Sequence, residues 1–177
     1  WLFLPIILII IALLLYLGLI VQRINASQDS NGKRLYTDIK KVASNPSVFK
    51  WKYVDFYGRV LGIENDSGGA YLQVYSDVTS YSDTVLVKCS TIPDTLKDDD
   101  CVHIEGQVIK STNAFNLFGV QMTLACIDAE SVEEVDYITA AAPTKKTLNV
   151  NGELNHNNYI ANIDKVEYAE KETRVYF

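Results

Sequence analysis

The first 22 residues of this 177-residue chain carry no charge, because all 38 Lys, Arg, Asp and Glu side chains lie after Gln22. The chain also has only three cysteines, two histidines and one methionine. Three cysteines are too few for a disulfide-dense small domain. After Gln22 the composition is that of an ordinary soluble domain, which excludes a polytopic membrane protein, a disordered chain and a fibrous repeat.

Residues 1–22 form one long apolar run. Crossing a hydrocarbon core takes about 20 apolar residues, and a helix satisfies its own backbone hydrogen bonds there. A cleaved signal peptide is the alternative, but its apolar stretch spans only about 7–15 residues and ends at small residues. This run ends in Leu19-Ile20-Val21. We therefore expect a single-pass membrane anchor over residues 1–22, and the lack of an initiator Met suggests that further residues precede Trp1.

Charge is unevenly distributed after this segment. Residues 23–59 hold eight basic and three acidic side chains, a net charge of +5, and the rest of the chain carries −11. Positive-inside counting places the basic flank in the cytoplasm, but missing upstream residues could reverse that orientation. The flank could equally lie against anionic headgroups, or be a solvated helix and strand. We expect the soluble part on the extracytoplasmic side of a bacterial cell membrane.

The hydrophobic period changes along the next hundred residues. After a polar linker over residues 23–34, Leu35, Ile39 and Val42 recur at helical spacing and stop before Asn45-Pro46. Alternating patterns then predict five strands, over residues 52–63, 70–77, 83–89, 101–109 and 118–128. Strands of this length and spacing are typical of a small antiparallel-rich barrel or sandwich.

The alternation also predicts which side chains point inward. The expected inward residues are Val54, Phe56, Gly58, Val60, Gly62, Leu72, Val74, Val102, Ile104, Gly106, Val108, Val120, Met122, Leu124 and Cys126. Gly58 and Gly106 occupy matching offsets in two strands, and glycine inside a strand indicates a tight bend or a bulge. Residues 138–148 are expected to be a linker before a second strand-rich unit over residues 149–177.

Residues 36–135 resemble the OB-fold domains, of the tRNA-anticodon-like type, of single-pass membrane-anchored bacterial proteins. The motifs that carry the resemblance are Asn45-Pro46-x-x-Phe49-Lys50, Val54-x-Phe56-x-Gly58-x-Val60, Leu96-Lys97-Asp98-Asp99-Asp100-x-Val102-x-Ile104-x-Gly106 and Met122-Thr123-Leu124-x-x-Ile127-x-Ala129. Cys126 stands where the family usually has proline. Residues 163–176 resemble the start of the immunoglobulin-like domain that often follows.

The resemblance implies architecture, since the family has no well-established activity. It implies an all-β protein with an N-terminal transmembrane helix, and a five-stranded OB-type barrel over residues 35–137 that is preceded by a short helix. An incomplete β-sandwich segment, the start of an immunoglobulin-like domain, is then expected over residues 149–177. In the OB strand order the third and fifth strands are parallel neighbours.

The three cysteines fit no zinc-binding spacing. With the OB strand order, Cys89 and Cys126 would point inward near the same end of the barrel, while Cys101 would alternate outward. A Cys89–Cys126 disulfide is one alternative outside the cell. Two buried free thiols are the alternative that we favour, because free cysteine is among the most buried residue types.

The sequence shows no catalytic pattern. Neither His103 nor His156 has a recognisable nucleophile nearby, and Cys101 with His103 lacks the further ligands of a metal site. Residues 66–69 form a hairpin turn and not a phosphate loop, and residues 98–100 lack the alternating ligands of a calcium loop. We therefore expect neither an enzyme nor a cofactor or metal.

The outward face of the first two strands is the candidate ligand-binding surface. Its residues are Tyr57, Arg59, Tyr71, Gln73 and Tyr75. OB barrels bind oligonucleotides or oligosaccharides on such strands, and aromatic rings there can stack on bases or sugars. The net charge of −11 after residue 59 disfavours nucleic acid.

The expected function is therefore a non-catalytic binding or sensing module of the cell envelope. Its expected partners are the lipid bilayer, through residues 1–22, and a protein or envelope glycan. A membrane-tethered OB-fold nucleic-acid binder and a structural spacer for a further domain are the two alternatives.

Overall fold

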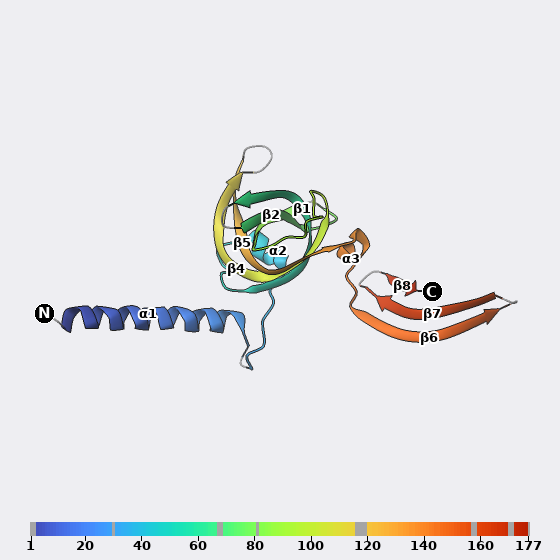
Figure 1. Ribbon diagram of the computed structural model, residues 1–177, viewed down its shortest axis with the longest axis horizontal. Coiled ribbons are helices and arrows are strands. Elements are labelled where there is room, and N and C mark those ends of the chain that lie inside the picture. The colour runs from blue at the N-terminus through green and yellow to red at the C-terminus, as the bar shows by residue number, and fades with distance from the viewer. Residues whose placement is uncertain are drawn as a thin grey trace.

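The computed structural model describes residues 3–29, 31–66, 69–80, 82–115, 120–156, 159–169 and 172–176. It contains an N-terminal helix, a closed five-stranded barrel and a three-stranded sheet (Figure 1). The elements in chain order are α1 (Phe3–Ser27), α2 (Ile39–Ser44), β1 (Tyr53–Asp66), β2 (Gly69–Asp77), β3 (Ser82–Cys89), β4 (Cys101–Phe115), β5 (Gln121–Val135), α3 (Tyr137–Ala141), β6 (Lys146–His156), β7 (Tyr159–Tyr168) and β8 (Thr173–Tyr176).

Helix α1 is apolar and extends away from the barrel (Figure 1). Its segment Pro5–Asn25 is 21 residues long and apolar enough to cross a membrane, and none of it is buried against the rest of the described chain. The helix continues to Ser27, so the first part of the expected linker is helical. The Ser27 hydroxyl donates to the Arg23 carbonyl, one turn earlier in the helix, at 2.8 Å.

The barrel has the strand order β1-β2-β3-β5-β4. Its β3 and β5 run parallel, and all other neighbouring strands run antiparallel. This order confirms the expected OB-like barrel and the expected contact between the third and fifth strands.

Helix α2 packs its apolar side onto the barrel core. Ile39 and Val42 are buried in the same cluster as the inward residues of the strands. Asp38 caps the helix, because its carboxylate accepts from the backbone N–H of Lys40 at 2.9 Å. Leu35, which helical spacing had placed on this helix, lies before it and is exposed. Figure 1 shows α2 within the outline of the barrel.

Two glycines allow strands to approach closely. A Cβ atom on Gly58 would lie 2.7 Å from the Tyr75 carbonyl oxygen and would also collide with Val74. A Cβ atom on Gly106 would lie 2.6 Å from the Asp128 carbonyl oxygen, beside a bulge in the β4–β5 ladder. Both positions therefore exclude a side chain, which is the physical basis of the glycine pattern.

A bulge corrects the inward pattern of β1. The β1–β2 register shifts between Val60 and Gly62, so that Gly62 pairs with Gln73 and Ile63 pairs with the buried Leu72. One extra residue moves every later side chain to the opposite face of the strand. Ile63 therefore packs against the core in place of Gly62.

The inward phase predicted for β5 is also wrong. The core cluster contains Ala125 and Ile127, whereas Val120 is 57% and Met122 is 37% exposed. Residues 124–127 are all apolar and all buried. The sequence pattern was therefore equally consistent with either set of alternating residues of this strand pointing inward.

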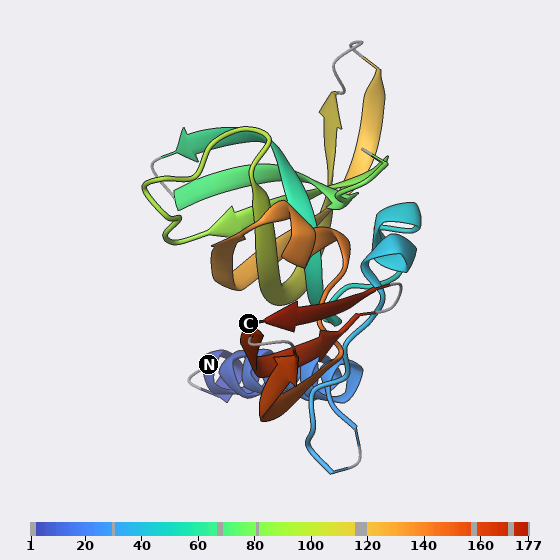
Figure 2. The ribbon, with the colours of Figure 1, turned by 90° about the vertical axis from the view of Figure 1, so that its right-hand side faces the viewer.

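The exposed part of β5 belongs to a long hairpin with β4. Strand β4 runs to Phe115, past the expected bound at Ile109, and β5 spans Gln121–Val135, so it starts later than expected and ends past the expected bound at Asp128. Pairing continues to Phe115↔Gln121. This hairpin projects from the rest of the barrel in Figure 2.

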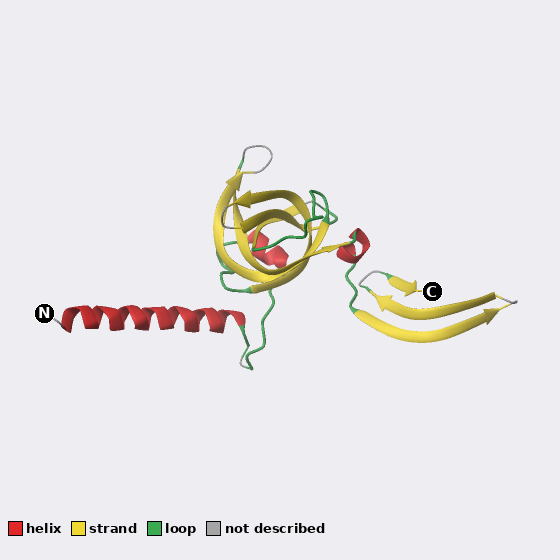
Figure 3. Ribbon diagram, viewed as in Figure 1, coloured by secondary structure: helices red, strands yellow, loops and turns green. Residues whose placement is uncertain are grey.

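The expected linker after the barrel is partly structured. Residues 137–141 form α3, and β6 starts at Lys146. Strands β6, β7 and β8 form an antiparallel sheet in that order, drawn in yellow apart from the barrel in Figure 3. Arg174 of β8 donates from Nη2 to the carbonyls of Ile138 at 3.0 Å and Ala142 at 2.5 Å. These bonds connect the sheet to α3.

Candidate binding groove on the barrel

A groove of about 410 Å³ lies on the outside of the barrel, at the base of the projecting hairpin. Residues of β2 and β3 contribute to it, together with the far end of β1 and the β4–β5 hairpin. Its lining residues are Gly62, Ile63, Glu64, Tyr71, Gln73, Leu86, Asp98, Thr112, Asn113, Ala114 and Leu124.

The lining combines apolar surface with hydrogen-bonding groups. Tyr71, Leu86 and Leu124 supply apolar surface, and Gln73 and Asn113 supply side-chain amides. The Thr123 hydroxyl donates to Asn113 Oδ1 at 3.2 Å, which orients one of these amides. An aromatic ring beside oriented amides can stack on a flat ligand face while it bonds the polar edges of that ligand.

The charge of the lining is negative. Glu64 and Asp98 are its charged members, and the described lining residues include no Lys, Arg or His. Two lysines lie on strands beside the groove. Lys88 pairs with Tyr71 across β2–β3, and Lys110 pairs with Cys126 across β4–β5.

The comparisons with known proteins add little to this geometry. No protein-family model and no curated protein matches the chain. Among solved structures, a small single-stranded DNA-binding protein from Streptomyces coelicolor matches with 18% identity over 49% of this chain and 94% of that chain, at a TM-score of 0.27. The strand order of this chain is what identifies its fold. The barrel is OB-like.

Two of the five predicted surface residues line the groove, namely Tyr71 and Gln73. Tyr57 lies elsewhere on the barrel and stacks on His103, with ring centroids 4.5 Å apart. Arg59 reaches the loop before β4, since its Nε donates to the Asp99 carbonyl at 3.1 Å. Tyr75 pairs with Arg59 across β1–β2 and is not among the lining residues.

Strand curvature and the β1 bulge explain this division. A barrel strand bends around the axis, so outward residues far apart along it point in different directions. Thr112 and Asn113 were missed because the sequence pattern ended the fourth strand at Ile109, and Leu124 was missed because the predicted phase of the fifth strand pointed it inward. Residues 110–115 contain neither Gly nor Pro, and that absence of a breaker was the available signal for a longer strand.

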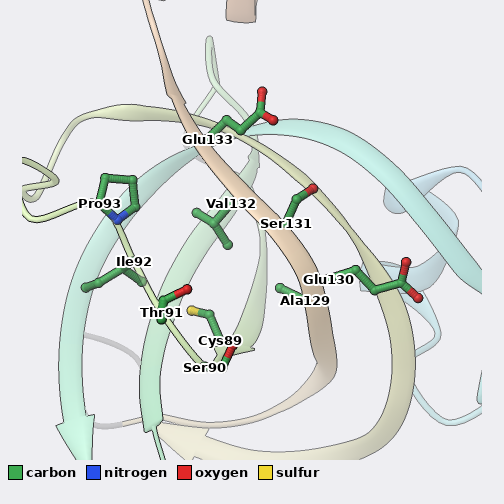
Figure 4. A pocket seen from close by; sticks show the side chains of 10 residues that line it. All are labelled: Cys89, Ser90, Thr91, Ile92, Pro93, Ala129, Glu130, Ser131, Val132 and Glu133. Carbon is green, nitrogen blue, oxygen red and sulfur yellow. The ribbon is translucent and has the colours of Figure 1, made fainter.

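A second hollow of about 350 Å³ lies between the end of β3 and β5 (Figure 4). Residues 89–93 line one side of it and residues 129–133 line the other. The Cys89 thiol lies on this hollow, and burial raises its pKa to about 11. A thiol with so high a pKa is a poor nucleophile at neutral pH.

All three cysteines are free and buried. Cys126 pairs with Leu86 across β3–β5, whereas Cys89 pairs with Ala70 on β2. The inward core cluster contains Cys89 but not Cys126, so the two thiols do not share the expected inward position. Cys101 also lies outside that core. It packs with Val78, which follows β2, and with Ala140 of α3, and it is only 6% exposed.

The described residues include no cluster of three or more potential metal-binding side chains. His103 Nε2 lies 2.7 Å from Asp55 Oδ1, and the His103 ring stacks on Tyr57. These contacts occupy the described histidine in the barrel wall. The side chain of His156 lies outside the described part of the structure.

Proposed function

We propose that this chain is a non-catalytic binding module that α1 anchors in a membrane, and that the groove on the OB-like barrel holds its ligand. The helix supports the first part, because its 21-residue apolar segment is unburied against the rest of the described chain. A helix of this composition is unstable in water without a partner, and the bilayer supplies one.

The lining of the groove is the observation that carries the ligand assignment. It offers Tyr71 as a stacking platform, amides from Gln73 and Asn113, and carboxylates from Glu64 and Asp98. Sugar rings present apolar C–H faces and hydroxyl edges, which match a ring surrounded by amides and carboxylates. We therefore propose a glycan of the cell envelope as the ligand. A protein segment is the alternative ligand for the same groove.

A nucleic-acid ligand is the second candidate. Lys88 and Lys110, on strands that form the groove, favour it, because phosphates are bound through basic side chains. Against it, residues 35–137 carry eight basic and sixteen acidic side chains, a net charge of −8. A structural spacer is the third candidate, and it predicts no ligand in the groove.

We further propose that the barrel lies outside the cytoplasm of a bacterial cell and that β6–β8 open an immunoglobulin-like domain. The sheet supports the second point, because Leu148, Val166 and Val175 are aligned across its three strands. Such an apolar row on one face is what a second packed sheet covers in a sandwich.

The test compares two probes on the chain in lipid nanodiscs: an N-acetylglucosamine tetramer and an oligothymidylate. We expect calorimetry to detect the sugar, with weak dependence on salt. Tyr71→Ala should weaken binding about tenfold, since stacking on one aromatic ring is worth about 1–3 kcal/mol. The matched control is Tyr137→Ala, which removes an exposed tyrosine on α3.

Three other outcomes would change the proposal. Binding of the oligothymidylate that weakens steeply with added salt would establish the nucleic-acid alternative. Equal loss in the Tyr71 and Tyr137 variants would remove the groove as the site. Binding of neither probe, with folding intact, would contradict the glycan assignment and leave the protein and spacer alternatives.

A further inference from the structure

Four cationic residues lie on segments that meet at the end of α1. They are Arg23 at the end of α1, Lys50 and Lys52 in the segment before β1, and Lys110 on β4. None of the four forms an ion pair within the described residues. Arg23 and Lys50 both lie over the indole of Trp51, at 5.0 Å and 4.6 Å from the ring centroid.

Backbone hydrogen bonds place this cluster on one edge of the barrel. The Trp51 N–H donates to the Val108 carbonyl at 2.7 Å, and the Val108 N–H donates to the Lys52 carbonyl at 2.9 Å. The segment before β1 therefore lies along β4, two residues from Lys110. Trp51 holds a positive φ of 71°, which a bulky residue seldom adopts. The basic edge is defined as Arg23, Lys50, Trp51, Lys52 and Lys110.

Two of the nearby acids, Glu105 and Glu130, have partners of their own, whereas the exposed Asp128, opposite Gln107 on β5, has no ion pair within the described residues. Arg34 lies 3.1 Å from Glu105 and 2.7 Å from Glu130, and the Tyr36 hydroxyl also donates to Glu105. The Glu130 carboxylate raises the pKa of Arg34 further above its ordinary value. These two carboxylates therefore do not cancel the charge of the basic edge.

Other acidic residues lie at the far end of β1. The Asp99 N–H donates to the Val60 carbonyl, so residues 98–100 lie beside Val60. Tyr53, next to the basic edge, and Val60 are seven residues apart along β1.

We propose that the basic edge binds the anionic phospholipid headgroups of the bilayer that α1 enters. This inference rests on the proposed membrane anchor. The anchor holds these cations next to the headgroups, where unpaired lysines and arginines are attracted to anionic lipids. The Trp51 indole suits the same layer, since tryptophan favours the membrane–water interface. The barrel then stands on the membrane at the basic edge.

The experiment measures acrylamide quenching of Trp51 in the full chain, in a Trp1→Phe background. The chain is reconstituted into vesicles of phosphatidylcholine alone, or of phosphatidylcholine with about one third phosphatidylglycerol. Acrylamide is uncharged, so the vesicle charge does not alter its local concentration. We expect the quenching constant to fall about twofold in the anionic vesicles.

Two triple variants separate this surface from charge in general. Lys50→Gln/Lys52→Gln/Lys110→Gln should abolish the difference between the two kinds of vesicle. Lys88→Gln/Lys97→Gln/Lys146→Gln removes the same charge elsewhere and should keep the difference. Each variant is compared with itself in the two lipids, so a direct effect of Lys50 on the Trp51 emission cancels.

Two results would overturn the inference alone. They are equal quenching of the Trp1→Phe chain in both lipids, and an unchanged difference in the Lys50/Lys52/Lys110 variant. Flotation of the chain with neutral vesicles tests the anchor separately. If the chain floats but Trp51 shows no lipid-dependent protection, the proposed anchor stands and the proposed role of the basic edge is overturned. If the chain does not float, both proposals are overturned.

Discussion

Arg23 in α1 and Gln107 in β4 are joined by two hydrogen bonds across 84 residues of sequence. Arg23 donates from Nε at 2.9 Å and from Nη2 at 2.5 Å to Gln107 Oε1. The Gln107 amide in turn donates to the Trp51 carbonyl at 3.0 Å. Gln107 is only 3% exposed, so this one side chain connects the helix end, the segment before β1 and the barrel wall.

Replacing Gln107 by leucine should loosen that junction. The variant leaves the Trp51 carbonyl without its donor and Arg23 without its acceptor, which costs about 1–3 kcal/mol for each buried polar group left unpaired. We expect faster hydrogen exchange over residues 31–36 and lower stability in denaturant. Gln121→Leu, at an exposed end of β5, should change neither.

Substitution by alanine should lower the stability of the chain at Gly58 and leave it almost unchanged at Gly62. Gly58→Ala forces a Cβ against Val74 and the Tyr75 carbonyl, and overpacking of this kind costs about 3 kcal/mol. Gly62→Ala meets nothing within 4 Å and should leave stability within about 0.5 kcal/mol of the parent chain. Urea unfolding of the detergent-solubilised chain measures both. Equal destabilisation would contradict the close β1–β2 crossing at Gly58.

Protonation of Asp77 should lower the stability of the barrel in acid. Lys40, whose Nζ lies 2.8 Å from its carboxylate, and Thr79 hold the pKa of Asp77 well below its ordinary value. A lowered pKa in the folded state gives stability that is present above the unfolded value, about 3.9, and is lost as pH falls below it.

Asp77→Asn should therefore remove part of the pH dependence of unfolding below about pH 4, by about 1 kcal/mol because the ion pair is partly exposed. The comparison is Asp94→Asn, in an exposed loop, which should keep the parent slope. If the Asp77 variant kept the pH dependence of unfolding of the parent chain, the contact with Lys40 would contribute nothing to stability.

The native thiols should resist alkylation until the chain unfolds. All three are buried, and burial raises the pKa of Cys89, Cys101 and Cys126. We expect no maleimide labelling of the folded chain at neutral pH, and complete labelling in denaturant. Rapid labelling of one thiol in the folded chain would show that its element opens.

That protection makes a single introduced cysteine a reporter of orientation. Asp94→Cys places an exposed thiol on the loop after β3. With a membrane-impermeant maleimide, labelling in intact cells would support the extracytoplasmic orientation. Labelling only after permeabilisation would place the barrel inside the cell and make nucleic acid the leading ligand.

Local sequence patterns were sufficient for the class and order of α1, α2 and the five barrel strands. The uncharged run over residues 1–22 predicted a long apolar helix, and alternation with a period of two predicted all five barrel strands. Gly58 and Gly106 predicted tight bends or bulges, and in the structure they lie where neighbouring strands leave no space for a side chain. These features depend on neighbouring residues, which is why the sequence expresses them directly.

Tertiary structure decided what the local pattern left open. In β5, Leu124 and Cys126 are as apolar as Ala125 and Ile127, so only pairing with β3 and β4 selects the inward phase. The bulge after Val60 reverses the faces at the end of β1, and α3 covers Cys101. The groove likewise combines side chains from all five strands. Each of these outcomes depends on contacts between segments far apart in the chain, which periodicity along one segment does not contain.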